Sequence, residues 1–375
     1  MIPFNKPYMT GDELYYIKDA VNRGKISGNG YYTEKCHNFF REMIGFRNCL
    51  LTSSCTDALE MAAILIDIKP GDEVIMPSYT FVSTANAFVL RGAKIVFADS
   101  YKENPNIDAD SLENLISDKT RAIVVVHYAG VACDMNTIMA LSKKHNLFVI
   151  EDAAQAIDSY YEEKPLGSIG HLAAFSFHET KNIISGEGGM LVINDKQFDK
   201  RAEIIWEKGT NRSAFFRGEV DKYSWVDVGS SFLPSDVTAA FLFAQLENLQ
   251  KIQSRRITLW NNYFESLKEL EEEGLLKLPL IPDYASVNGH LFYLVCNSIE
   301  ERSALISFLK KYGILSVFHY LSLHKSPYYC KENAVELKNC DNFADRLVRL
   351  PLYYELDIED QNKIIELIIS FFRKR

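Results

Sequence analysis

The sequence predicts an α/β protein with a large, mixed but mostly parallel sheet domain, followed by a smaller α+β domain. Between residues 47 and 194, short β-branched runs alternate with longer helical stretches, a pattern typical of a parallel sheet with helices on both faces. The run at 122–126 is apolar at every position, as expected for a strand buried on both faces. After about Ser235, a long helical stretch replaces the alternation.

The same patterns place the elements in order along the chain. The short apolar runs predict strands at 50–52, 73–76, 94–97, 122–126 and 147–150. The longer segments between these runs predict helices at 56–65, 80–90 and 136–144. A helix over 237–270 carries its charges on one face, and we expect it to bridge two domains. It is followed by a strand at 291–295 and helices at 301–311 and 359–372.

Length and composition limit the domain organisation and the partners. A chain of 375 residues exceeds what one hydrophobic core usually holds, so we expect a large domain over 1–250 and a small domain over 251–375. The formal net charge of -9 argues against a nucleic-acid partner. No stretch approaches the ~18 apolar residues of a membrane span. The 7 cysteines include no C-x-x-C pair, so we expect no metal site or disulfide framework and a cytoplasmic protein.

Small hydroxyl residues follow the first predicted strand. Ser53, Ser54, Cys55 and Thr56 stand where a helix begins, and the free N–H groups of a helix start can bind phosphate. Taken alone, this segment is better explained by ordinary N-capping.

A carboxylate ends the strand at 147–150. Glu151 and Asp152 follow it directly, with Gln155 close behind. A carboxylate at the end of a buried strand is costly unless a cation pairs with it, and a protonated pyridine nitrogen is such a cation. A helix cap or a metal ligand is the alternative interpretation of Asp152.

A lysine follows an aromatic strand and precedes a glycine-rich turn. Lys181 lies five residues after Ser176, and the glycines at 186, 188 and 189 come next. A lysine with a lowered pKa in such a place is a candidate for a Schiff base, although a single lysine is usually a solvated surface group. The phosphate-type turn, the strand-end aspartate, the lysine and the glycines are far more specific together than any one of them.

These motifs resemble those of the DegT/DnrJ/EryC1/StrS sugar aminotransferases, which are fold-type I (aspartate aminotransferase-like) pyridoxal-phosphate enzymes. The resemblance runs nearly end to end, and its motifs lie at 71–81, 127–130, 151–155 and 176–182. Within the family, it is closest to the transaminases that form dTDP-4-amino-4,6-dideoxygalactose, notably over 77–97 and 204–225.

The resemblance implies roles for the residues around the cofactor. Lys181 resembles the lysine that holds the cofactor covalently and moves protons, and Asp152 resembles the partner of the ring nitrogen. Phe81 matches the aromatic residue that stacks on the ring, and Gln155 matches a residue near the ring oxygen. Contacts with the cofactor's phosphate are expected from Ser54, Cys55, Thr56 and Ser176.

Substrate contacts are expected from four further residues. His319 resembles a small-domain residue that faces the sugar, and His178 either contacts the sugar or only packs. Phe216 and Arg217 belong to a polar, aromatic segment that we expect at a subunit interface, a mobile surface loop being the alternative. Many family members have an Asn that reaches the phosphate across the dimer; here Ser231 stands in its place.

The resemblance also implies the reaction. We expect a homodimer with shared active sites that takes the amino group from L-glutamate, releases 2-oxoglutarate, and keeps the nitrogen as pyridoxamine phosphate. The expected acceptor is dTDP-4-keto-6-deoxy-D-glucose, aminated to dTDP-4-amino-4,6-dideoxy-D-galactose for surface polysaccharide such as lipopolysaccharide. The alternatives are amination at C3, the C4 gluco epimer, a related sugar dehydratase, and a non-catalytic relative. The dehydratases carry His in place of the lysine, so Lys181 argues against them.

Overall fold

The fold is built on a seven-stranded sheet with strand order β1-β9-β8-β5-β4-β2-β3. The computed structural model describes residues 1–330 and 335–374. The neighbouring pairs among β8, β5, β4, β2 and β3 are parallel, whereas β9 is antiparallel to both β8 and β1. The strands are β1 (Cys49–Thr52), β2 (Glu73–Pro77), β3 (Lys94–Ala98), β4 (Thr120–Val126), β5 (Phe148–Asp152), β8 (Leu172–Ser176) and β9 (Gly189–Ile193). The predicted mixed, mostly parallel sheet is confirmed.

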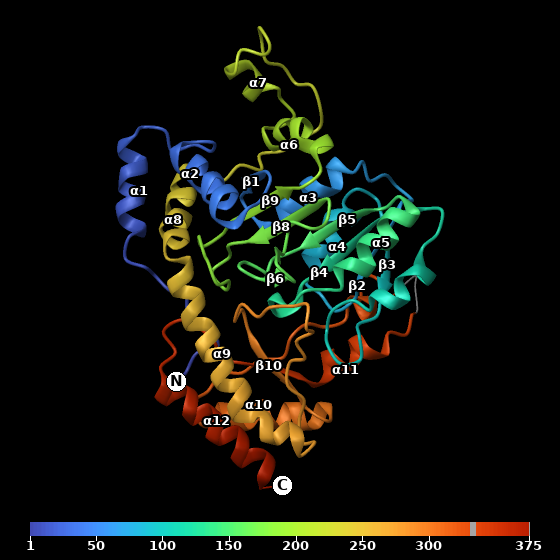
Figure 1. Cartoon of the computed structure of the whole chain (residues 1–375), viewed down its shortest axis with the longest axis vertical. Helices are drawn as coiled ribbons and strands as arrows, with labels where there is room; N and C mark the ends of the chain where they lie inside the picture. The colour runs from blue at the N-terminus through green and yellow to red at the C-terminus, as the bar shows by residue number, and fades with distance from the viewer. Residues whose placement is uncertain (331–334, 375) are drawn as a thin grey trace.

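Helices cover both faces of this sheet. Alternate residues of β4 enter two different cores: Ala122 and Val124 pack into one, Ile123 and Val125 into the other. The first core also holds residues of α3, α4 and α6, and the second holds residues of α2, α5 and α8 (Figure 1). The bounds of these helices are α2 (Tyr31–Phe39), α3 (Cys55–Leu65), α4 (Val82–Val89), α5 (Met135–His145), α6 (Asp199–Trp206) and α8 (Asp236–Glu247).

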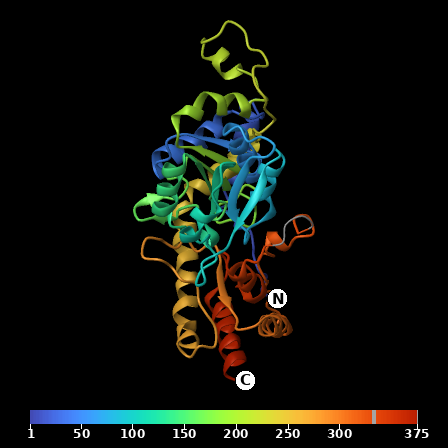
Figure 2. The ribbon, with the colours of Figure 1, turned by 90° about the vertical axis from the view of Figure 1, so that its right-hand side faces the viewer.

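A smaller unit lies beside the sheet. Its two antiparallel strands, β10 (Phe292–Val295) and β11 (Leu347–Leu350), pack with three helices around a third core. These helices are α9 (Leu249–Glu272), α10 (Ile299–Lys311) and α12 (Ile358–Arg373). Figures 1 and 2 both place this unit at one end of the molecule, where the C-terminus lies, and α7 (Arg212–Phe216) at the opposite end.

The helix predicted over 237–270 is in fact two helices, so that prediction is wrong in this respect. Asn248 interrupts it with a φ of -104° and a ψ of 10° between α8 and α9. Its side-chain amide donates to the carbonyl of Ala244 at 3.0 Å, which is the local bonding that makes Asn a poor residue inside helices. No Gly or Pro stands near the break, so the sequence pattern alone did not reveal it.

The remaining elements connect or flank these layers. They are α1 (Glu13–Asn22), a π-helical turn (Phe40–Ile44), 3₁₀ turns (Ala109–Leu115, Tyr128–Gly130, Lys196–Phe198, Leu323–Lys325), a small hairpin of β6 (Tyr160–Tyr161) and β7 (Lys164–Pro165), and α11 (Lys338–Arg346). Within the described ranges, no helix is long and apolar enough to cross a membrane.

Candidate active site

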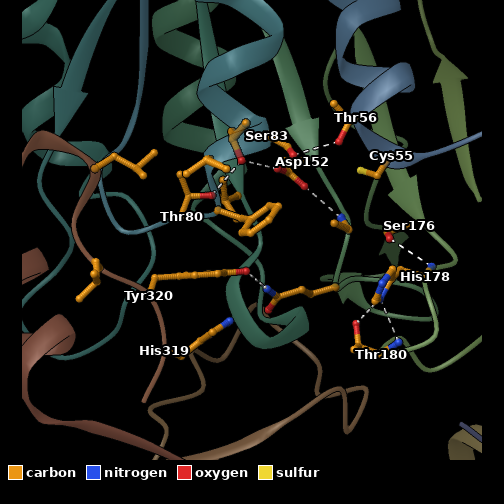
Figure 3. A pocket seen from close by; sticks show the side chains of 18 of the residues that line it. Cys55, Thr56, Thr80, Ser83, Asp152, Ser176, His178, Thr180, His319 and Tyr320 are labelled. Atoms are coloured by element: carbon orange, nitrogen blue, oxygen red, sulfur yellow. Dashed lines mark hydrogen bonds between the residues drawn. The ribbon is translucent and has the colours of Figure 1, made fainter. Parts of the chain in front are cut away.

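A cavity of about 1020 Å³ opens beyond the carboxyl ends of β5 and β8, the edge where ligands of open parallel sheets bind. Residues of the seven-stranded sheet and of the segments next to it line one side of the cavity. The segment 318–327, together with residues of α11 and β11, lines the other side (Figure 3). Of the residues predicted from the sequence, those that line this cavity are Ser54, Cys55, Thr56, Phe81, Asp152, Gln155, Ser176, His178, Lys181 and His319.

Asp152 is the last residue of β5. The strand continues two residues beyond its predicted end because Glu151 and Asp152 still pair in register with Val125 and Val126 of β4. The carboxylate accepts hydrogen bonds from Thr84 Oγ1 at 2.7 Å and from the backbone N–H of Ala154 at 3.2 Å. Burial raises the pKa of Asp152, and these hydrogen bonds oppose the rise. A cation at this position would stabilise the ionised form further.

Lys181 lies in the loop between β8 and β9. Burial lowers the pKa of its amine, and the neighbouring Cys55 and Asp152 oppose that effect. A lowered pKa provides the neutral amine that a nucleophile or a base requires. The carboxylate of Asp152 and the amine of Lys181 thus influence each other's pKa across the same cavity.

The glycine-rich turn has a structural role at this point. A Cβ atom on Gly189 would lie 2.3 Å from the carbonyl carbon of Ser54, so only glycine lets β9 pass the start of α3. Gly189 also pairs with Thr52 of β1. Gly189 therefore allows two backbone segments to approach each other closely, and the second segment is the start of the protein's own helix α3.

The start of α3 faces the cavity. Ser54 is its N-cap, and Ser54 Oγ accepts from the backbone N–H of Asp57 at 3.0 Å, so the N-capping interpretation is correct for that side chain. The hydroxyl of Thr56 donates to Ser83 Oγ at 2.9 Å. Helix N-termini present N–H groups without intrahelical partners and favour negative charge, so this end of the cavity suits a phosphate.

Two side chains suit a flat ring in the middle of the cavity. Phe81 caps α4, and 55% of its surface is exposed, which is unusual for a phenyl ring unless a ligand covers it. The amide of Gln155 is held at both ends: its oxygen accepts from Ala129 N at 2.7 Å, and its nitrogen donates to the Tyr320 hydroxyl at 3.0 Å.

The two predicted substrate-facing histidines differ in their surroundings. His319 Nδ1 lies 2.8 Å from the Tyr128 hydroxyl, and burial, together with the charges of Arg349 and Lys181, lowers its pKa, so the ring is neutral. His178 Nδ1 lies 2.9 Å from Thr180 Oγ1 (Figure 3).

Three predicted residues lie outside the cavity of this single chain. Phe216 and Arg217 belong to the projecting α7 segment, where the Arg217 guanidinium pairs with Glu203 at 2.6 Å and Glu219 at 2.7 Å. Ser231 is exposed and forms an isolated bridge with Glu207. Their predicted roles require a second subunit.

Sequence reasoning missed several residues that line or support the cavity. Thr84, Tyr320, His290 and Arg349 all line it. Thr84 stands one helical turn after Thr80, and that i, i+4 spacing was a usable signal. Tyr320 stands next to the predicted His319. Nothing local distinguished His290 or Arg349 from ordinary polar residues.

The donor set fits pyridoxal phosphate. The cavity offers a carboxylate for the ring nitrogen, a helix start for the phosphate, an exposed phenyl ring and a half-buried lysine with a lowered pKa. This lysine and a strand-end aspartate, in a fold of this topology, define the class of pyridoxal-phosphate-dependent enzymes. The chain belongs to the DegT/DnrJ/EryC1/StrS aminotransferase family, whose model matches residues 7–369.

Individual relatives agree with this family membership. The chain is 32% identical over 377 residues to the spore coat polysaccharide biosynthesis protein SpsC of Bacillus subtilis, covering 98% of this chain and 96% of that protein. The aminotransferase TlmJ of Streptoalloteichus hindustanus superposes with a TM-score of 0.91 at 26% identity, covering 100% of this chain and 99% of TlmJ. The putative sugar aminotransferase Spr1654 of Streptococcus pneumoniae, in its PMP form, superposes with a TM-score of 0.92 at 25% identity, covering 100% of both chains.

These findings establish an aminotransferase of this family that depends on pyridoxal phosphate. Spr1654 has also been solved in its PLP form, to which this chain is 25% identical with a TM-score of 0.90 and coverage of 100% of this chain and 99% of that one. The predictions of family, fold class and cofactor are confirmed.

Proposed function

We propose that this enzyme transfers the amino group of L-glutamate to dTDP-4-keto-6-deoxy-D-glucose and forms dTDP-4-amino-4,6-dideoxy-D-galactose for surface polysaccharide synthesis. The observation that carries the transferase part is that the half-buried Lys181 and the buried Asp152 line one cavity. The choice of acceptor rests on the sequence resemblance over 77–97 and 204–225.

The residues that would hold the cofactor occupy distinct parts of the cavity. Asp152 would pair with the ring nitrogen, Phe81 would cover one face of the ring, and Gln155 would lie near the ring oxygen. The α3 start would bind the phosphate through Ser54, Cys55 and Thr56, with Ser176 beside them. When bound, the cofactor stores the amino group between the two substrates and withdraws electrons from the carbon that loses its proton.

Lys181 would bind the cofactor covalently until the amine of the donor replaces it, and the released Nζ would then act as the base and acid of the reaction. Its Nζ removes a proton from the donor's Cα in one half of the cycle and returns a proton to the sugar carbon in the other. The lowered pKa of its amine favours the neutral form that accepts this proton. Because one amine delivers the proton, it arrives on one face only, which sets the configuration of the product.

The far side of the cavity would hold the nucleotide sugar. The volume of about 1020 Å³ is at the upper end of the range of small-molecule sites, which suits a substrate larger than the amino donor. The neutral imidazole of His319 and the hydroxyl of Tyr320 offer hydrogen bonds to sugar hydroxyls without adding charge. His178 lies on the Lys181 side of the cavity.

We further propose a homodimer in which the 210–235 segment of each chain completes the other chain's cavity. In a single chain this segment projects from the body (Figure 1) and leaves Phe216 69% and Trp225 81% exposed, an aromatic content typical of an interface. A large domain over 1–250 and a small domain over 251–375 remain our proposed division. A cytoplasmic location accords with the described cysteines, none of which forms a disulfide.

The test is an assay of the purified holoenzyme with L-glutamate against a panel of nucleotide keto-sugars, followed by NMR of the product. We expect 2-oxoglutarate release only with an acceptor, the dTDP-4-keto sugar as the preferred one, and an axial amine at C4. An equatorial C4 amine or nitrogen at C3 would replace the proposed product with one of the alternatives. Loss of a hydroxyl without amine transfer would identify a dehydratase instead.

A further inference from the structure

Arg349 is a cation inside the cavity without an anionic partner. It lies in β11, where its backbone pairs with Tyr293 and bonds to Val317, and its side chain lines the cavity. Its Nε is buried and has no hydrogen-bond partner. Among the described residues, no carboxylate forms an ion pair with it.

The guanidinium is held in place by aromatic rings. The ring of Phe4 lies 4.6 Å from the central carbon of the guanidinium, in cation–π contact. Burial lowers the pKa of Arg349, and the nearby tyrosines Tyr128, Tyr320 and Tyr79 oppose that effect. Burying an unpaired charge is costly, so a position of this kind is explained when an anionic ligand supplies the missing partner.

The other lysine and histidine side chains of the cavity are not available for an anion. His178 Nε2 faces a carboxylate, 3.7 Å from Glu187. Lys325 already pairs with Asp341 at 2.7 Å. Burial lowers the pKa of both His290 and His319, which keeps the rings neutral. Lys181 is the reacting amine. Among the described lining residues, Arg349 is therefore the cation left to bind a charged group of a substrate.

We propose that Arg349 binds the α-carboxylate of the amino donor, an inference that rests on the proposed function. The charge of Arg349 acts on Lys181 directly, since it lowers the pKa of that amine. The guanidinium and the reacting amine therefore lie within electrostatic range of each other in one cavity. In an α-amino acid, the carboxylate and the amine sit on the same carbon, so an anion site near Lys181 matches the α-carboxylate.

Arginine is the residue type suited to this task. Its planar fork donates two parallel hydrogen bonds to a carboxylate, which fixes the orientation as well as the position. The orphan Nε is one of the donors available for such a pair. The keto-sugar ring carries no charge, and the anionic diphosphate is attached at C1, across the ring from the carbon that reacts at Lys181. Arg349 should therefore contribute little to the half-reaction with the sugar and should distinguish the two half-reactions.

The two half-reactions can be measured separately on the holoenzyme with Arg349→Gln and Arg349→Lys. Stopped-flow absorbance follows the pyridoxal form as L-glutamate converts it, and separately the pyridoxamine form as the keto-sugar converts it. Because a buried charge pair is lost, we expect the KM for L-glutamate in Arg349→Gln to rise on the order of 100-fold. The half-reaction with the keto-sugar should change by less than about 3-fold, and Arg349→Lys should recover part of the glutamate affinity.

A second readout uses 4-aminobutyrate, which is glutamate without its α-carboxylate. The wild-type enzyme should discriminate strongly between the two amines, and Arg349→Gln should lose most of that discrimination. Calorimetric titration of the pyridoxal form with 2-oxoglutarate, a pair that has no amino group to transfer and so does not react, should show the same weakening on the order of 100-fold.

Arg302→Gln is the matched control. Arg302 also packs its guanidinium over an aromatic ring, Phe318, at 5.6 Å and also has a buried Nε, but it does not line the cavity. Its kinetics should equal those of the wild type. Equal losses in both half-reactions of Arg349→Gln, or unchanged discrimination, would overturn the proposal. If the wild type reacts with glutamate but with none of the sugars, the proposed acceptor fails and the glutamate test of Arg349 stands.

Discussion

Thr84 donates a hydrogen bond to the carboxylate of Asp152, with 2.7 Å between Thr84 Oγ1 and Asp152 Oδ2. Thr80 Oγ1 lies 2.9 Å from Thr84 Oγ1, and because the Thr84 proton is directed at Asp152, Thr80 is the donor of that second bond. The chain of hydroxyls from α4 thus orients the aspartate and favours its ionised form. It links one helix of the sheet domain to the strand end that faces the cofactor site.

Replacing Thr84 with Val removes this hydrogen bond with little change in shape. A hydrogen bond to a charged group contributes about 1.5–3 kcal/mol, so we expect pyridoxal phosphate to bind roughly 10- to 100-fold more weakly. Spectroscopic titration of the apoenzyme measures this constant. Thr84→Ser keeps the hydroxyl and should bind as the wild type does; equal affinity in Thr84→Val would mean that the bond does not support cofactor binding.

Replacing Lys181 with Ala should abolish turnover and leave the fold intact. Loss of a positioned acid–base group alone slows a reaction by about 10²- to 10⁴-fold, and here the covalent attachment of the cofactor is lost as well. Circular dichroism and the melting temperature report the fold, and 2-oxoglutarate release reports turnover. Near-normal transamination by this variant would refute the role of Lys181.

The proposed shared site can be tested by mixing two inactive variants. Lys181→Ala lacks the reacting amine, whereas Ser231→Asp places a carboxylate where we propose that the partner's phosphate binds, and like charges repel. Random exchange makes half of the dimers mixed, each with one intact site, so roughly a quarter of the wild-type activity should return.

Ser303→Asp is the control for this experiment, because Ser303 is exposed on α10, outside the 210–235 segment, and carries the same added charge. This control variant should be active without being mixed with another variant. Sedimentation at assay concentrations should show dimers. An active monomer, or no recovery on mixing variants that do exchange subunits, would contradict the shared site.

The carboxylate of Glu151, next to Asp152 at the end of β5, should make the stability of the fold depend on pH. It is fully buried and accepts backbone hydrogen bonds from Gly167 at 2.7 Å, Ile169 at 2.8 Å and Gly170 at 2.6 Å, besides lying 2.9 Å from His127 Nε2. Burial raises its pKa, but these partners outweigh burial and leave the pKa below its ordinary value of 4.5. A lowered pKa means that the ionised carboxylate stabilises the fold above pH 4.5 and loses this effect as the pH falls through its folded-state pKa.

Glu151→Gln should therefore lower the melting temperature strongly near neutral pH, since disrupting a buried pair costs about 3–5 kcal/mol. The difference in melting temperature between Glu151→Gln and the wild type should become smaller as the pH falls below 4.5. Glu163→Gln makes the same change on an exposed side chain and should leave the melting temperature within a degree or so. A constant difference at all pH values would show that the charge of Glu151 does not matter.

Much of the sheet and of the cofactor side of the cavity was predictable from local pattern. The apolar run at 122–126 does lie between two cores, and Asp152 and Lys181 do line one cavity. Local signals sufficed here because parallel strands bring their carboxyl ends to one edge of a sheet. Residues that follow different strands therefore meet, however far apart they are in the sequence.

The sequence by itself determined which chemical groups follow each strand, and its resemblance to known aminotransferases named their roles. Only the tertiary structure decided that Arg349, on a strand of the small sheet, lines the same cavity as Lys181 with its Nε buried, and that no carboxylate among the described residues pairs with it. It also decided that Ser231 lies outside its own chain's cavity. The physical reason is that burial and charge pairing depend on contacts between segments far apart in the chain, which short-range periodicity does not encode.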